Sequence, residues 1–219
     1  MTTFPDAPRL LKGGIVLLDP DTSVVLRVIA LQYNPDTLTR TLQVQGVGGE
    51  SGDRLEALRL KGPPVETIKL DAEIDATDQL EFPNQNPNAA QLGIQPQLSV
   101  LETILYPSSA QLQFTDGLAG VGALEIAPAE APLTVFVWSK NRIVPVRITE
   151  FSITEEAFDT TLNPIRAKVS LGMRVLSVND LPVSHKGASL FLSYHQQKER
   201  MAALSASVTL SVLGLTRLP

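Results

Sequence analysis

Few residues of this 219-residue sequence have the types and spacing that catalysis or metal binding requires. There is no cysteine, which excludes a thiolate nucleophile and cysteine–zinc sites. The two histidines, His185 and His195, are not accompanied by the further ligands or the nucleophile that a functional histidine needs. We therefore expect both histidines to lie on the solvated surface.

Three other patterns could carry chemistry, and each has a simpler interpretation. The glycine-rich residues 46–51 lack the lysine of a phosphate-binding loop, which favours a plain loop. Asp71, Glu73 and Asp75 lie in a row on one strand, whereas a glycosidase needs two carboxyl groups facing each other across a cleft. Phe136 and Trp138 suit core or interface packing better than an aromatic platform for sugars. The sequence thus predicts no enzyme, no metal and no cofactor.

Composition excludes two further classes of protein. The 18 basic and 23 acidic residues are scattered and give a net charge of −5, which argues against binding nucleic acid through its phosphates. The apolar runs are much shorter than the roughly 20 residues of a membrane helix, and the first residues show no signal-peptide pattern. We therefore expect neither a nucleic-acid nor a membrane partner, and synthesis in the cytoplasm.

Period-two alternation is the main structural signal along the chain. In residues 65–74, Ile68, Leu70, Ala72 and Ile74 point one way, and Thr67, Lys69, Asp71 and Glu73 point the other. Residues 38–47 likewise place Thr39, Thr41, Gln43 and Gln45 on a polar face. Further strands are expected at residues 9–18, 24–32, 133–138, 143–153 and 166–175, with turn signals between them. The fold class is mainly β, a small barrel or sandwich.

Two helices are expected. Residues 97–105 have leucine and isoleucine at helical spacing and form the one short inner helix, whereas residues 107–122 are expected to be irregular. Residues 187–204 form an amphipathic C-terminal helix. Its apolar side chains, expected to be poorly covered on a single molecule and to contact a partner, are Leu190, Phe191, Tyr194 and Met201. This predicts a β-barrel domain over residues 1–178 and a loop, helix and tail extension over residues 179–219.

Two blocks of sequence resemble one protein family. Residues 32–38, Gln-Tyr-Asn-Pro-Asp-Thr-Leu, resemble the (F/Y)NP-x-x-(L/I) element of inner-tube and tube-initiator proteins of contractile injection systems, which are phage-tail-like particles. Residues 132–138 and 144–148 are similar to the P-x-x-x-F-x-W strand pair of that family, and residues 158–169 to its F…G-x-P-x-R-A-x-V continuation, with Asn163 in place of the glycine. The motif positions are Tyr33, Asn34, Pro35, Leu38, Phe136, Trp138, Phe158, Pro164 and Arg166.

The resemblance implies a structural baseplate and inner-tube adaptor that forms a six-fold ring between the spike hub and the inner tube, in an assembled particle that is cytoplasmic or released. The implied partners are further copies of the chain, the inner-tube protein, the spike or hub protein, and a baseplate wedge or sheath initiator. The LysM module of many adaptors is not evident here. Because a channel wall should be polar so that cargo slides without sticking, the polar faces of residues 39–45 and 67–73 are expected to line the lumen. The alternatives are a tube initiator or terminator layer, or a monomeric β-sandwich that binds carbohydrate.

Overall fold

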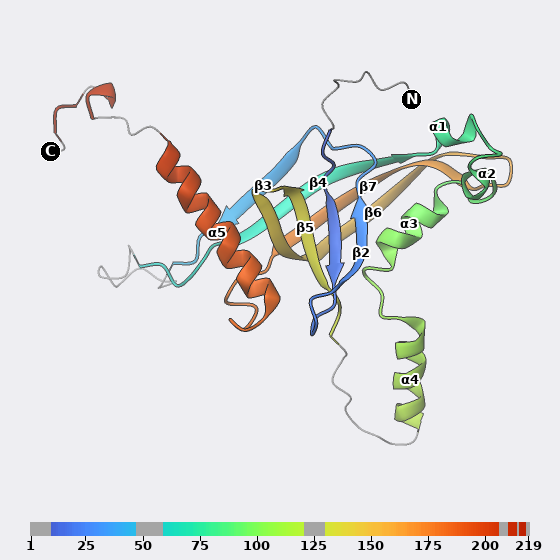
Figure 1. Ribbon diagram of the computed structural model, residues 1–219, viewed down its shortest axis with the longest axis horizontal. Helices are drawn as coiled ribbons and strands as arrows, with labels where there is room; N and C mark the ends of the chain where they lie inside the picture. Colours follow the sequence, from blue (N-terminus) through green and yellow to red (C-terminus); the bar gives the residue numbers. More distant parts are fainter. Residues whose placement is uncertain (1–9, 47–58, 121–129, 206–209, 214, 218–219) are drawn as a thin grey trace.

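The fold is built on one antiparallel sheet. The computed structural model describes residues 10–46, 59–120, 130–205, 210–213 and 215–217, and seven strands of this part pair in the order β2-β1-β5-β6-β7-β4-β3 (Figure 1). The strands are β1 (Gly14–Leu18), β2 (Val25–Ala30), β3 (Leu38–Gln43), β4 (Val65–Asp75), β5 (Leu133–Ser139), β6 (Arg142–Phe158) and β7 (Pro164–Val175). The prediction of a mainly β protein is confirmed.

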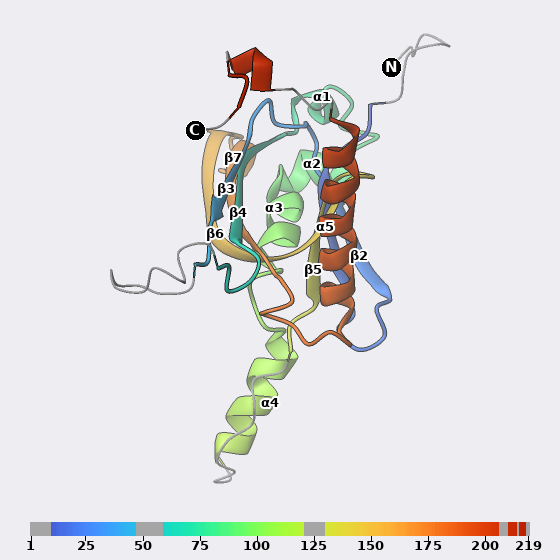
Figure 2. The ribbon, with the colours of Figure 1, turned by 90° about the vertical axis from the view of Figure 1, so that its left-hand side faces the viewer.

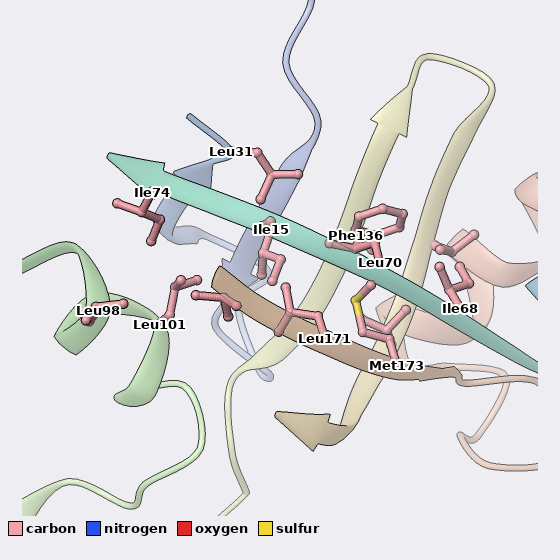
Figure 3. Close-up of a cluster of buried hydrophobic side chains, with 14 of the residues drawn as sticks. Ile15, Leu31, Ile68, Leu70, Ile74, Leu98, Leu101, Phe136, Leu171 and Met173 are labelled. Carbon is pink, nitrogen blue, oxygen red and sulfur yellow. The ribbon is translucent and has the colours of Figure 1, made fainter. Parts of the chain in front are cut away.

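The main core cluster lies on one face of this sheet, which curls around it (Figures 2 and 3). The even-numbered apolar residues of β4 from Ile68 to Ile74 are buried, as are the odd-numbered residues of β7 from Ala167 to Val175. Phe136 of β5 and Ile15 of β1 close the cluster from the other half of the sheet. Each large apolar side chain of this cluster contributes about 1.5–3 kcal/mol when it is fully buried. In β4 and β7, the apolar side of the predicted alternation therefore faces the core, and the polar side faces solvent.

The described part of the connection between β4 and β5 contains four helices, where one was expected. They are α1 (Thr77–Leu80), α2 (Pro87–Leu92), α3 (Gln95–Glu102) and α4 (Ser109–Gly120). Helix α3 overlaps the predicted inner helix, and its Leu98 and Leu101 point into the core (Figure 3). The expectation of irregular chain at residues 107–122 is wrong. Helix α4 begins after Ser108, whose Oγ accepts a hydrogen bond from the Gln111 amide at 3.2 Å, as an N-cap residue does.

Helix α5 (Lys186–Leu204) covers the other end of the curled sheet, next to the first half of β6 (Figure 2). Ala188, Phe191 and Tyr194 recur every three residues, so they share one face of the helix, and all three are buried. The expectation that Phe191 and Tyr194 are poorly covered on a single molecule is therefore wrong, because the curl of the sheet supplies their cover within the same chain. Leu190 is half-buried, and Met201 is exposed.

The last described element is a short 3-10 helix at Leu210–Leu213. None of the helices in the described part of the chain is long and apolar enough to cross a membrane.

Candidate functional site

The polar face of the sheet is the most extensive candidate site. Thr39 pairs with Lys69, Thr41 with Thr67, and Gln43 with Val65 across β3 and β4. Residues that pair directly share one face of a sheet, so the two predicted polar rows are neighbours. Thr39, Thr41, Gln43, Lys69, Asp71 and Glu73 are exposed, while Thr67 and Gln45 are half-buried, and Gln45 lies just beyond the end of β3. The sequence pattern predicts each row but not that the two rows are adjacent.

The same face continues over β7 and β6. Lys168 of β7 lies between Glu73 of β4 and Thr154 of β6, and Ser170 lies between Asp71 and Ser152. The charged side chains of this polar face are five basic residues, Lys69, Arg147, Arg166, Lys168 and Arg174, and five acidic residues, Asp71, Glu73, Asp75, Glu150 and Glu156. We call this set, with the polar residues of β3 between Thr39 and Gln43, the polar face. Its formal charge is balanced.

Most charges of the polar face are paired across strands. Lys69 Nζ lies 2.6 Å from Glu150 Oε2, and Lys168 Nζ lies 3.2 Å from Glu156 Oε1. The Ser170 hydroxyl donates to Asp71 Oδ1 at 2.6 Å. The electric fields of two opposite charges this close largely cancel at larger distances, and salt screens the remaining field beyond about 10 Å. The polar face is therefore hydrophilic without presenting a net charge.

Asp75 closes the polar face at one end and ties it to the start of β3. Its carboxylate accepts from Arg166 Nε at 2.9 Å. Burial raises the pKa of Asp75, but hydrogen bonds from Thr77 and Arg166 outweigh burial and hold that pKa below its usual value. The Asp75 backbone is held by the Gln32 side-chain amide, which donates to its carbonyl at 2.6 Å and accepts from its N–H at 3.0 Å. Gln32 therefore joins the β2–β3 connection to β4, although β2 and β3 are the two edges of the sheet.

Several residues that carry the family resemblance hold the fold together through hydrogen bonds and packing. Asn34 accepts from the Gly13 amide at 2.9 Å and donates to the Leu11 carbonyl at 2.8 Å, so it fixes the chain entering β1. Phe136 is buried and stacks on half-buried Trp138, with ring centroids 6.0 Å apart. A Cβ at Gly13 would lie 2.6 Å from the Trp138 ring, so Trp138 packs over the Gly13 backbone. Phe136 and Trp138 therefore pack within the fold, in agreement with the packing role favoured from the sequence. Leu38 packs against the core, Pro35 is half-buried, Pro164 is buried, and Tyr33 and Phe158 are exposed.

Asn163, which stands where the motif of the resembled family has glycine, closes the turn between β6 and β7. Its backbone N–H donates to Asp159 Oδ1 at 2.8 Å, and its side-chain amide donates to Asp159 Oδ2 at 2.9 Å. These bonds, led by the side-chain one, lower the pKa of Asp159 to about 2. Where the motif of the resembled family has glycine, Asn163 thus closes the turn through hydrogen bonds to Asp159.

A buried charge cluster that the sequence patterns did not predict holds α5 against the sheet. The Glu66 side chain is only 3% exposed and accepts from Arg40 Nε at 2.8 Å, from Lys198 Nζ at 2.8 Å and from the Tyr194 hydroxyl at 2.9 Å. We call Arg40, Glu66, Tyr194 and Lys198 the Glu66 cluster. The available signal was Glu66 itself, because its position on β4 has the parity of the core-facing residues Ile68 and Leu70.

The Glu66 cluster shifts two pKa values in opposite directions. Burial raises the pKa of Glu66, but the hydrogen bonds from Lys198 and Arg40 outweigh it and lower that pKa below its usual value. Burial and the negative charge of Glu66 raise the pKa of Tyr194 to about 12. Lys198 Nζ also lies 4.0 Å from the centroid of the Tyr194 ring. This is the geometry of a structural ion cluster that fixes a helix, with no group free to exchange a proton near neutral pH.

The remaining candidates do not assemble into a reaction centre. His195 is exposed, as predicted, but the expectation that His185 is solvated is wrong, because its side chain is only 14% exposed. His185 caps α5, and its Nδ1 accepts from the Gly187 amide at 3.0 Å. Within the described ranges, no group of three or more histidine, aspartate or glutamate side chains could hold a metal ion. Of residues 46–51, only Gly46 lies among the described residues.

No protein-family model matches this sequence, and neither does any curated protein.

Proposed function

We propose that this chain is a structural adaptor of the baseplate and inner tube of a contractile injection system, and that copies of it assemble into a six-fold ring around a channel. The motif resemblance motivates the class of machine. The observation that carries the proposal is the polar face, because the two rows expected to line a lumen are adjacent and extend over four strands.

The electrostatics of the polar face suit a channel wall. Cargo that passes such a wall meets hydroxyl, amide and mutually paired charged groups, with ion-pair distances of 2.6 and 3.2 Å at Lys69 and Lys168. Paired charges attract neither acidic nor basic cargo strongly. A wall without large apolar side chains also gives cargo little hydrophobic surface to adhere to.

The two edges of the sheet suit assembly from several copies. Edge strand β2 exposes Val25, Leu26 and Val28, and edge strand β3 exposes Leu42, with Val44 just beyond it. An exposed apolar edge with unpaired backbone groups favours pairing with another chain. Sheet edges completed by neighbouring copies would remove this liability, and a closed ring would do so for every copy.

Negative-stain electron microscopy and mass photometry of the purified full chain test the proposal. We expect particles with the mass of six copies and top views with six-fold symmetry around a pore. A monomer at every concentration would overturn the proposal, and glycan binding by that monomer would favour the carbohydrate-binding alternative.

Gold labelling tests the orientation of the polar face. Because the chain has no cysteine, Gln43→Cys and Asp71→Cys each provide one labelling position on that face. We expect small gold clusters to appear in the central pore of the rings. Lys140→Cys, in the exposed turn between β5 and β6, is the matched control and should place gold elsewhere. Gold on the outer perimeter for Gln43→Cys and Asp71→Cys would refute the lumen assignment.

A further inference from the structure

Helix α4 projects from the rest of the molecule as an arm (Figures 1 and 2). Its twelve residues span about 18 Å at the usual rise of an α-helix. Leu112 is 54% exposed, and Asp116 is exposed and has no hydrogen bond or ion pair with any described residue. These two side chains are four residues apart, so they lie on the same face of the helix, about 6 Å from each other. The arm therefore presents an apolar group next to a carboxylate.

A cavity of about 320 Å³ opens on the body at the root of the arm. Its apolar walls include Ile104, Leu133, Ile148, Leu176 and Leu181, and its polar groups are Glu130, Thr134, Arg147 and His185. Arg147 lies at the end of the polar face, where that face meets the cavity; it is exposed and has no acidic partner among the described residues. We call this cavity the root groove.

His185 adds a hydrogen-bond donor to the root groove. Since Nδ1 accepts from the Gly187 amide, the proton of the neutral ring is on Nε2. That Nε2 is buried and makes no hydrogen bond with the described residues; the nearest acidic atom, Glu130 Oε1, lies 3.8 Å away. A buried donor without an acceptor costs about 1–3 kcal/mol. The root groove thus offers apolar walls together with a guanidinium and an N–H that both suit a carboxylate.

We propose that the root groove binds the α4 arm of a second copy of this chain, with Leu112 against the apolar walls and the Asp116 carboxylate between Arg147 and His185. The arm has no other charged side chain, so its chemistry matches that of the groove. Its own arm is poorly placed to fill the groove, because α4 leads away from the root (Figure 2). Glu130 is the one acidic group of the lining, and it is 65% exposed, which lets it turn into solvent.

The contact joins two different surfaces, so it repeats head to tail and generates a ring when the rotation closes. The inference deepens the proposed function and rests on its self-association. It assigns the arm and the root groove as a contact between neighbouring copies, in addition to the sheet edges.

Charge reversal tests the arm contact in the full chain. We expect Asp116→Arg or Arg147→Glu alone to weaken self-association about tenfold or more, measured as the dissociation constant by sedimentation equilibrium. The double variant should recover to within about twofold of the original chain, because it restores an opposite-charge pair. Asp78→Arg, an equal charge reversal on exposed α1, is the control and should leave the dissociation constant unchanged.

Cross-linking locates the contact. We expect a bismaleimide linker about as long as an arginine side chain to cross-link separately tagged Asp116→Cys and Arg147→Cys copies when the two are mixed, because a direct disulfide needs Cα atoms within about 7 Å. A cross-link within one molecule of the double cysteine variant, and none between copies, would overturn the proposal. Rings that form normally but respond to neither the charge reversals nor the cysteine pairs would overturn the arm contact and leave the proposed ring standing. A chain that stays monomeric at every concentration would overturn both.

Discussion

Glu66→Gln should destabilise the protein far more than its conservative chemistry suggests. The change keeps the size of the side chain but removes the charge that Arg40 and Lys198 share across the interface between β4 and α5. Both cations then lie close together without an anion. The hydroxyl of Tyr194, which now donates to Glu66, can still donate to the amide oxygen.

The magnitude follows from burial. Removing one partner of a buried ion pair costs about 3–5 kcal/mol. Arg40 and Lys198 are 28% and 31% exposed, so both recover part of their hydration, which reduces the cost. We therefore expect the free energy of unfolding to fall by roughly 2–3 kcal/mol. Tyr194→Phe removes one hydroxyl donor and should cost about 1 kcal/mol.

Urea unfolding followed by the fluorescence of Trp138, the only tryptophan, measures these changes. The matched control is Glu73→Gln, on the same strand but on the exposed face, with no ion pair to any described residue. It should change the free energy of unfolding by less than about 0.5 kcal/mol. If Glu66→Gln were as mild as Glu73→Gln, the Glu66 cluster would not be holding α5, and the reasoning would fail.

The pKa shifts of the Glu66 cluster also predict a pH window. The folded pKa of Glu66 lies below its ordinary value of 4.5, so its stabilising effect is present above pH 4.5 and is lost as the pH falls through the folded pKa. The folded pKa of Tyr194 is raised from 10.0 to about 12, so its effect is present below pH 10 and is lost as the pH rises toward 12. We expect the difference in unfolding free energy between the original chain and Glu66→Gln to be constant from about pH 5 to pH 10 and to narrow in acid. A difference that persists unchanged through acid would contradict the assignment.

Three further predictions concern other parts of the fold. Deleting residues 188–219 should abolish cooperative urea unfolding, because Phe191 and Tyr194 belong to the core; a deletion variant that unfolds like the full chain would contradict their role. Gly93→Ala should cost roughly 2 kcal/mol or more, because Gly93 has φ +58° and a Cβ there would lie 2.1 Å from the Pro164 carbonyl oxygen. Gly117→Ala on α4, where a Cβ meets nothing within 4 Å, is its control and should be neutral or stabilising in thermal unfolding. Lys69→Ala should change stability by at most about 0.5 kcal/mol, since Lys69 and Glu150 are 58% and 60% exposed, and a loss well above 1 kcal/mol would show a tighter pair than the geometry implies.

The periodicity of the chain predicted the strands well because burial follows a local rule. A strand with one face on the core must alternate. Strand β4 alternates over its whole length, and the odd-numbered residues of β7 from Ala167 to Val175 are buried. The turn residues around Asn163 likewise predicted the start of β7, whereas β6 continues to Phe158, beyond its expected end at residue 153. Helix α4 escaped prediction because it projects from the sheet with Leu112 and Phe114 exposed, so no apolar stripe facing a core marks it.

The sequence pattern does not show which distant segments of the chain pair with each other. The alternation of residues 38–45 and 67–73 defines two polar rows, but only the register Thr39–Lys69 makes them one surface, and register depends on contacts across the whole sheet. Phe191 and Tyr194 form an apolar stripe in any reading of the sequence; whether the stripe meets a partner or its own core depends on the curl of the sheet. In the sequence, Glu66 is a charged residue on the apolar face of a strand. Folding brings Arg40 to it from 26 residues earlier in the chain, and Lys198 from 132 residues later. The local sequence pattern thus predicted the strands and α5, whereas long-range packing decided what each polar or apolar face contacts.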